Sequence, residues 1–232
     1  WNRSLEREEK ATKDRHRYKK LTIENKESNK WQASSKATKV NLKEAAMVII
    51  VQDREGDIYE QFATIPDAQT NLLIRAKSDR ALPEGGKLFS KLSKCKVAGT
   101  YEIKIDGDNR KGQKKRTAKL EVRFTELTLK NSSRTAKTAA ATVKLWAVEA
   151  REVGGTSKQK VCWRLLTTIP VTTLSEALMI IEWYSWRWII EEVFRILKKE
   201  GFNIEASELE SGRSIKKLCL LMLDAIIKIF QM

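Results

Sequence analysis

The strongest constraint on the fold is one stretch of sequence, from about Leu174 to Lys199, in which apolar residues recur with helical periodicity. It contains no Gly or Pro, and the residues at its start offer N-caps, namely Thr172, Thr173 and Ser175. We therefore predict one long helix. Most of its circumference is apolar, which suits a helix packed inside a domain, and the tryptophans expected in the core are Trp183, Trp186 and Trp188.

The polar residues of this stretch fall on one stripe of the predicted helix. Their offsets of 0, 3, 7, 11 and 14 follow the helical turn, and they are Tyr184, Arg187, Glu191, Arg195 and Lys198. One carboxylate is therefore placed among cations and a phenol. The stripe is either a solvated face with ion pairs at spacings of three and four, or a metal-binding carboxylate beside cations that bind phosphate.

A second acidic segment follows a predicted buried strand. Met47–Val51 is a continuous apolar run, typical of a strand covered on both faces of an α/β sheet. Asp53 and Asp57 come directly after it, at the strand end where open α/β sheets bind ligands and where carboxylates can hold Mg2+. The alternative is that one of them caps the helix expected from Asp57 to about Thr64, and Asp57 is the stronger candidate for the cap.

The rest of the chain contains further strands and one more helix. Asn71–Arg75 is predicted to be a second buried strand, and alternating apolar residues over 97–161 predict half-buried antiparallel strands. Between the first two of these strands, the turn Asp106–Arg116 carries five cations, either as an ordinary hairpin tip or as a loop that faces DNA. Val161–Thr168 is another predicted strand, and Leu218–Phe230 is an amphipathic helix that is too short and too charged to span a membrane.

Composition narrows the class of protein. The 232 residues include 45 Lys and Arg against 30 Asp and Glu, a net charge of +15, which favours a polyanionic partner. The three cysteines stand singly, which fits a reducing compartment. The single histidine, His16, lies in a polar run, so that a His-based zinc site or a Ser-His-Asp triad is excluded.

Two motifs resemble a known family. The order Y-x2-R-x3-E-x6-K from Tyr184 to Lys198 resembles the YREK signature of the insertion-sequence-four family of DDE transposases, and D-R-E-x-D-I at Asp53–Ile58 is similar to its second catalytic motif. The resemblance covers roughly residues 24–230. It implies an α/β fold with an RNase H-like core and a β-rich insertion, and cut-and-paste chemistry with Mg2+ or Mn2+. In that chemistry, transposon ends are cleaved and joined to target DNA.

The resemblance also implies roles for single residues. Asp53 and Glu191 would be two ligands of a catalytic carboxylate triad that holds the metal ions. The DNA-binding residues would be Tyr184, Arg187, Arg195 and Lys198 on the helix, Trp163 on the preceding strand, and Arg75 and Lys77 after the second buried strand. For Trp163, which would stack on a flipped base, the alternative is a core tryptophan. Arg75 and Lys77 would contact phosphates, and the alternative for these two residues is an ordinary solvated strand end.

The family's first catalytic Asp precedes anything that matches here, and Asp14, which follows no apolar strand, does not replace it. We therefore expect a fragment that lacks the N-terminal part of the domain and is catalytically incomplete. The expected parts are 1–40, a polar linker or loose helix; 41–96, the first part of the core; 97–160, the insertion; and 161–232, the second part with the YREK helix and the start of a C-terminal helical region. Met47–Val51 would then be an exposed edge strand, so the chain alone should be marginally stable or self-associate.

The implied partners are double-stranded DNA, as transposon ends and target, and a second copy in the full-length protein. The implied location is the bacterial cytoplasm, at the nucleoid when DNA is bound, with no membrane contact. Two other functions stay open. One is a non-catalytic DNA-binding or inhibitory remnant of a transposase. The other is an unrelated basic nucleic-acid-binding module whose YREK spacing is accidental.

Overall fold

The computed structural model describes residues 26–105, 115–131, 141–154 and 160–231. The chain forms two compact units, Trp1–Tyr184 and Ser185–Met232, which we call the first and the second unit. Most of the predicted N-terminal linker, Asp14 included, and most of the predicted cationic turn Asp106–Arg116 lie outside the described residues.

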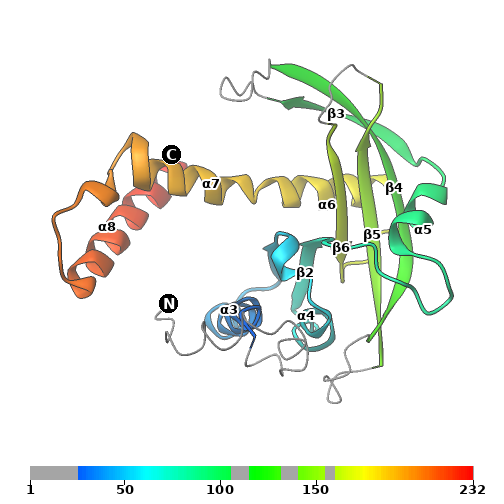
Figure 1. Ribbon diagram of the computed structural model, residues 1–232, viewed down its shortest axis with the longest axis horizontal. Helices are drawn as coiled ribbons and strands as arrows, with labels where there is room; N and C mark the ends of the chain where they lie inside the picture. The colour runs from blue at the N-terminus through cyan, green and yellow to red at the C-terminus, as the bar shows by residue number, and fades with distance from the viewer. Residues whose placement is uncertain (1–25, 106–114, 132–140, 155–159, 232) are drawn as a thin grey trace, which may run out of the picture. The chain divides into compact units, whose positions relative to one another are not determined.

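The first unit is built on one six-stranded sheet (Figure 1). In the order in which they lie side by side, the strands are β1 (Val48–Gln52), β2 (Thr70–Arg75), β6 (Cys162–Thr167), β5 (Thr142–Glu152), β4 (Arg116–Lys130) and β3 (Gly99–Ile105). β1 and β2 are parallel, and all other neighbours are antiparallel. The predicted strands and the mixed α/β class are confirmed. The sheet continues without a break from the predicted core into the predicted insertion.

Helices of the first unit cover both faces of this sheet. On one face, α4 (Tyr59–Thr64) and α5 (Leu88–Lys94) bury an apolar cluster that includes Leu72, Leu127 and Leu145. On the other face, α6 (Leu174–Ser185) packs on a second cluster, which includes Leu73, Leu120 and Val148. Successive residues of a strand point to opposite faces, so the long strands β4 and β5 supply side chains to both clusters.

β1 is the end strand of the sheet in the part of the chain that the structure describes, as the sequence predicts. The predicted exposure of its apolar faces is wrong. Val48 and Ile50 are buried in the cluster under α4, while Ile49 and Val51 are half-buried against the cluster under α6. Another helix, α3 (Asn29–Asn41), also contacts β1, and it begins within the segment predicted as a linker or loose helix.

The start of α6 follows the local signals in the sequence. Thr173 is its N-cap, and its hydroxyl accepts a hydrogen bond from the backbone N–H of Glu176 at 3.2 Å. The Glu176 carboxylate in turn accepts from the backbone N–H groups of Thr172, at 2.7 Å, and Thr173, at 2.9 Å. This reciprocal pair is a capping box. The hydrogen bonds from Thr172 and Thr173 hold the pKa of Glu176 below its ordinary value.

The run predicted as one helix is instead divided. It forms α6, then α7 (Trp188–Arg195), and then a π-helical turn, η4 (Ile196–Glu200). At the start of α7, the backbone N–H groups of Ile189 and Ile190 donate to the carbonyl oxygens three residues earlier in the chain. In a regular α-helix each N–H group would instead donate to the carbonyl oxygen four residues earlier. This local tightening lies within a few residues of the border between the two units.

The second unit consists of α7, η4, the short η5 (Ile204–Ala206) and α8 (Gly212–Gln231). Its buried core is small and comprises Leu197, Met222 and Ile226. The amphipathic helix predicted over Leu218–Phe230 is confirmed by α8. None of the helices in the described residues is long and apolar enough to cross a membrane.

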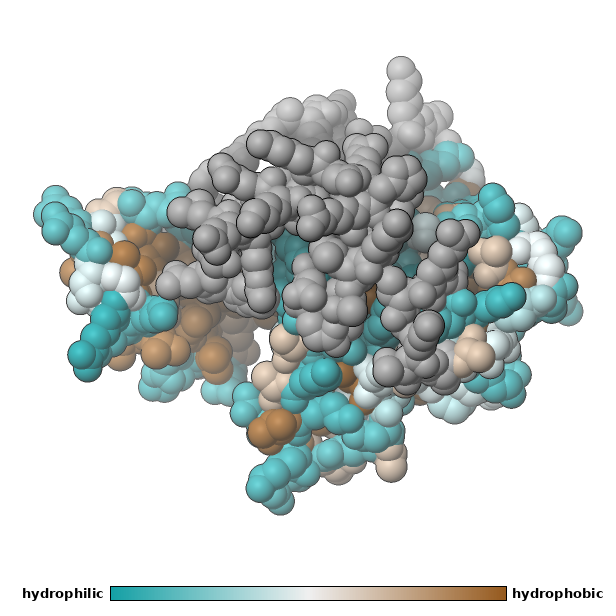
Figure 2. All heavy atoms as spheres, turned by 60° about the horizontal axis from the view of Figure 1, so that its bottom comes forward, coloured by the Kyte–Doolittle hydropathy of each residue, from teal (hydrophilic) through white to brown (hydrophobic). Residues whose placement is uncertain are grey.

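Large apolar side chains are exposed on the second unit. Trp186 and Trp188 are 55% and 54% exposed, so the prediction that they lie in the core is wrong. On α8, Leu220 and Leu221 are exposed as well, and Figure 2 shows apolar side chains gathered on the part of the molecule that carries α7 and α8 in Figure 1. Periodicity shows where apolar residues gather on a helix, but it does not supply the surface that covers them.

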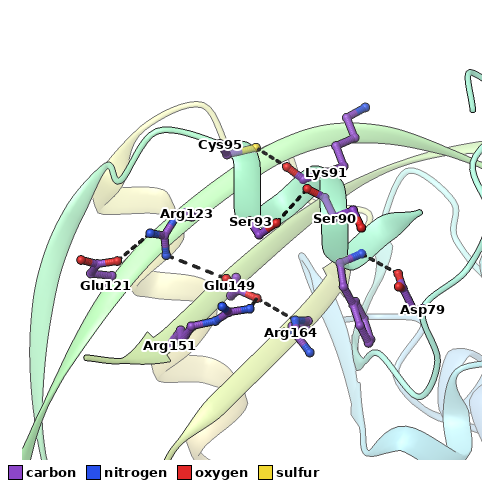
Figure 3. A network of polar contacts seen from close by, with 11 residues as sticks. Asp79, Ser90, Lys91, Ser93, Cys95, Glu121, Arg123, Glu149, Arg151 and Arg164 are labelled. Atoms are coloured by element: carbon purple, nitrogen blue, oxygen red, sulfur yellow. Dashed lines mark hydrogen bonds and ion pairs between the residues drawn. The ribbon is translucent and has the colours of Figure 1, made fainter. Parts of the chain in front are cut away.

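A buried ion network joins the three central antiparallel strands (Figure 3). Glu149 on β5 is fully buried, and its Oε2 accepts from Arg164 Nε on β6 at 2.6 Å and from Arg151 Nη2 at 3.1 Å. Arg123 on β4 lies 3.9 Å from Glu149 Oε1 and pairs with the partly exposed Glu121 at 2.6 Å. The partly exposed guanidinium groups of the three arginines therefore compensate the charge of the fully buried Glu149 carboxylate.

We expect Glu149→Gln to lower the free energy of unfolding by roughly 3 kcal/mol, because it removes the charge that holds three neighbouring guanidinium groups together. Glu121→Gln is the matched control, and since Glu121 is partly exposed its loss should cost less than about 1 kcal/mol. Urea denaturation followed by circular dichroism measures both. Equal effects of the two variants would contradict this account of the network.

Candidate functional site

Asp53 lies where the sequence predicts a ligand-binding strand end. β1 ends at Gln52, and Asp53 continues in extended conformation before the short helix η2 (Arg54–Gly56). β1 and β2 are parallel with Gln52 opposite Ile74, so that Asp53 and Arg75 come at the same edge of the sheet. Asp53 does not cap η2 through its side chain.

Tyr184, in the last turn of α6, contacts Asp53. The Tyr184 hydroxyl donates a hydrogen bond to Asp53 Oδ1 at 3.2 Å, across a sequence separation of 131 residues. The Tyr184 side chain is buried, with 2% of its surface exposed. Its ring meets the half-buried Trp163 in an edge-on contact, with the ring centres 6.1 Å apart. Three of the residues named from the sequence therefore meet within the first unit.

Asp57 has a structural role that differs from the predicted one. It does not cap α4, because Ile58 occupies the N-cap position. Its buried carboxylate instead accepts the backbone N–H of Lys77 at 2.7 Å and forms an ion pair with Arg80. Asp57 therefore ties the turn after β1 to the segment after β2, and a carboxylate used in this way is committed to the protein itself.

The two cations after β2 differ in their surroundings. Arg75 is half-buried, and its Nη2 donates to the carbonyl oxygen of Cys162 on β6 at 3.3 Å. Lys77 has an exposed side chain, while its backbone is held by Asp57. Of the two, the Lys77 ammonium is the more accessible to a phosphate.

The polar stripe continues into the second unit, where its cations are paired with glutamates. Arg187 Nη2 lies 2.9 Å from Glu191 Oε1, four residues later. Lys198 Nζ lies 3.3 Å from Glu205 Oε1, and Arg195 pairs with Glu192, three residues earlier. Spacings of three and four are those of the solvated-face interpretation. The exposed pairs of Arg195 and Lys198 contribute only about 0–1 kcal/mol each, whereas the Arg187 side chain is only 16% exposed.

The sequence analysis missed a buried network of polar side chains that includes Gln52, the residue that precedes Asp53. Gln52, Gln61 and Ser35 are buried side chains from β1, α4 and α3. Gln61 Nε2 donates to Gln52 Oε1 at 2.7 Å and to Ser35 Oγ at 3.2 Å, while Gln52 Nε2 donates to Ser35 Oγ at 3.1 Å. The network fixes the strand residue that precedes Asp53. The sequence contained one sign of this network, namely Gln52, a polar residue at the end of an otherwise apolar strand.

Gly56 closes the turn around this network. A Cβ added at Gly56 would lie 2.3 Å from Gln52 Oε1 and 2.7 Å from Gln52 Cβ, both closer than atoms can approach. The turn that carries Asp53 therefore packs against the Gln52 side chain so tightly that only glycine fits.

Each of the two carboxylates named from the sequence as metal ligands could contribute to binding a hard divalent cation, and the two lie in different units. Asp53 and Glu191 offer carboxylate oxygens, the ligands that Mg2+ and Mn2+ prefer. Within the residues that the structure describes, no group of three or more His, Cys, Asp or Glu side chains forms a metal-binding cluster.

We expect Gly56→Ala to lower the free energy of unfolding by about 1–3 kcal/mol, because the added methyl group must displace a hydrogen-bonded side chain. Gly154→Ala is no suitable control, since Gly154 has a positive φ of 69°. Gly212, where nothing lies within 4 Å of an added Cβ, is the matched position. Thermal melts of Gly56→Ala and Gly212→Ala test the prediction, which fails if the two variants melt together.

Comparison with known families agrees with the geometry at Asp53 and Tyr184. The family model for the transposase DDE domain matches residues 42–227, which include β1 with Asp53, the whole sheet and the polar stripe from Tyr184 to Lys198. This match covers most of the 232 residues. The chain therefore belongs to the transposase DDE domain family, enzymes that act on DNA and generally use divalent metal ions.

Proposed function

We propose that this chain carries the catalytic strand end and the YREK helix of a cut-and-paste transposase of the insertion-sequence-four type. In this proposal, β1 and β2 are strands of an RNase H-like core and the β-rich segment is its insertion. The protein cleaves transposon ends and joins them to target DNA, and it works as a homodimer in its full-length form.

The observation that carries the proposal is the hydrogen bond between Tyr184 and Asp53. The two motifs that resemble the family lie far apart in the sequence, and a chance match of each would not bring their side chains together. Asp53 also lies at the carboxyl end of a parallel strand, the place where open α/β sheets bind ligands.

Asp53 and Glu191 are the proposed metal ligands. Bound divalent cations would activate the attacking oxygen and stabilise the leaving oxygen at the scissile phosphate. Within the chain itself, Asp53 is held by Tyr184, and Glu191 is held by Arg187. In the first step, water attacks phosphorus and releases a 3′-hydroxyl. In the last step, that hydroxyl attacks a target phosphate and displaces a 3′-oxygen.

The proposed DNA contacts are the cations of the stripe together with Arg75, Lys77 and Trp163. The guanidinium and ammonium groups of the second unit already hold carboxylates, and phosphate oxygens offer the same acceptor geometry. Trp163 is half-buried and presents an indole that can stack on a base. These contacts would orient the transposon end, but contacts to phosphates would not distinguish its base sequence.

A second candidate function is a DNA-holding or inhibitory remnant without catalysis. The ion pair between Arg187 and Glu191 favours it, because the proposed metal ligand Glu191 already holds a cation of the protein. This protein would bind transposon ends through the same cations and would leave them uncut.

The first test is nicking of a cognate transposon-end duplex by the full-length protein with Mg2+ or Mn2+. We expect Asp53→Asn and Glu191→Gln to abolish metal-dependent nicking, since each removes a proposed ligand. The matched controls are Glu55→Gln and Glu192→Gln, exposed carboxylates next to each site, which should nick at near the wild-type rate. End binding without nicking by the full-length wild-type protein would support the second candidate, and nicking by its Asp53→Asn variant would contradict the proposed metal site.

The second test is the salt dependence of end binding. Each phosphate contact contributes to the slope of log K against log salt, so Arg187→Ala and Lys198→Ala should each reduce that slope by about one. Lys228→Ala is the matched control, because Lys228 is an exposed lysine on α8 paired with Asp224. Fluorescence anisotropy in EDTA measures binding without cleavage. An unchanged slope for both stripe variants would remove them from the DNA interface.

A further inference from the structure

We propose that the lysines around α5 form a second DNA-binding surface, which holds the phosphate backbone of a duplex whatever its base sequence. We call it the α5 surface and define it by Lys87, Lys91, Lys94 and Lys96. The DNA contacts proposed above include none of these residues. The inference rests on the proposed function for one point, namely that the polyanionic partner is DNA.

The first argument is a local excess of positive charge. Residues 77–96 contain six Lys and Arg against two Asp and Glu. Both carboxylates are already engaged, because Asp79 Oδ1 accepts the backbone N–H of Phe89 at 2.7 Å and Glu84 Oε1 accepts from Lys91 Nζ at 2.8 Å. This segment therefore has no further carboxylate to neutralise the other lysines of the α5 surface.

The second argument is that these other lysines are accessible. Lys87, Lys94 and Lys96 are exposed, and within the part of the chain that the structure describes none of them forms an ion pair. The cations of the polar stripe, in contrast, each have a glutamate partner. Phosphates can therefore neutralise the three lysines without breaking an ion pair of the protein.

The third argument is that this charge pattern does not stabilise α5. Lys87 occupies the N-cap position, where Ser, Thr, Asp and Asn are preferred, and its side chain makes no capping hydrogen bond. A positive charge at this end opposes the helix dipole, and the first turn has no acidic residue. Lys87, Lys91 and Lys94 also follow at spacings of four and three, where like charges repel. A bound polyanion would remove this repulsion.

The fourth argument is that the α5 surface begins close to Lys77, one of the proposed DNA contacts. Ala81 and Lys87 form a β-bridge, and the backbone N–H of Leu88 donates to the carbonyl oxygen of Arg80 at 2.9 Å. Four residues of chain from Lys77 and one bridge place Lys87 at most about 20 Å from Lys77. One turn of duplex DNA is about 34 Å long, so a single duplex can contact both lysines.

α5 presents its lysines from a fixed position on the sheet. Leu88 and Leu92 are fully buried in the apolar cluster that α5 shares with α4, and α5 contacts β4 and β5. The Phe89 ring lies 4.0 Å from the guanidinium of Arg164, beside the Glu149 network (Figure 3). Because the helix is already held in place, binding DNA requires little further ordering of the protein backbone.

The test is the salt dependence of DNA binding by the full-length protein. Fluorescence anisotropy in EDTA is measured with a cognate end duplex and with an unrelated duplex of the same length. The test variant combines Lys87→Gln, Lys94→Gln and Lys96→Gln. Each phosphate contact contributes about 0.9 to the slope of log K against log salt, so we expect the slope to fall by about two on both duplexes.

The matched control combines Lys36→Gln, Lys43→Gln and Lys228→Gln, which remove the same charge from exposed lysines elsewhere and should leave the slope nearly unchanged. Equal losses of slope in the two variants would reduce the effect to net charge and overturn the inference. An unchanged slope in the test variant would overturn it as well, and a loss confined to the cognate end would contradict binding independent of sequence. If the wild type binds neither duplex, the DNA partner of the proposed function fails and the inference with it.

A second measurement needs no variant. Acetylation of lysines in the full-length wild-type protein is followed by mass spectrometry with and without duplex DNA. Bound DNA should lower the acetylation of Lys94 and Lys96 severalfold and leave that of Lys36 and Lys228 unchanged, because a phosphate contact shields the ammonium group. Equal protection of all four lysines, or none on the α5 surface, would overturn the inference even if the triple variant did not fold.

Discussion

The structure of the first unit depends on covering both faces of one twisted sheet. Strands such as β2 and β5 carry apolar side chains on each face, and leaving either face in water would forfeit roughly 25 cal/mol per Å² of apolar surface. α4 and α5 cover one face and α6 covers the other. Because α6 must place its apolar side on the second cluster, its last turn brings Tyr184 to the carboxyl end of β1, where Asp53 follows. The candidate site is thus a consequence of sheet burial.

The polar groups of the first unit are buried in organised sets. Glu149 holds guanidinium groups from neighbouring strands, Asp57 holds the backbone after β2, and Gln52 joins an amide network with Gln61 and Ser35. Burying such groups without partners costs several kcal/mol, so each set restricts the packing of the elements that contribute to it. The last two sets lie on either side of Asp53 in the sequence. They hold the backbone on both sides of Asp53 in place.

The polar stripe is one sequence pattern with two structural environments. Its first residue, Tyr184, is buried in the first unit, whereas Glu191, Arg195 and Lys198 are exposed in the second. The exposed members of the stripe form ion pairs with glutamates, Arg195 with Glu192 and Lys198 with Glu205. Exposed pairs of this kind contribute only about 0–1 kcal/mol each.

Local features of the sequence determined much of the fold. Strand periodicity predicted β1 to β6, and Thr173 is one of the expected N-caps at the start of α6, because short-range sterics and hydrogen bonds act within a few residues. The resemblance to DDE transposases is confirmed by the family match. Only the tertiary structure decided which apolar residues are covered, so Trp186 and Trp188 are exposed where periodicity predicted a core. It also decided that Asp57 binds Arg80 and that Tyr184 binds Asp53. Such contacts join residues far apart in the chain, and their energy depends on the packing of whole elements, which no local pattern contains.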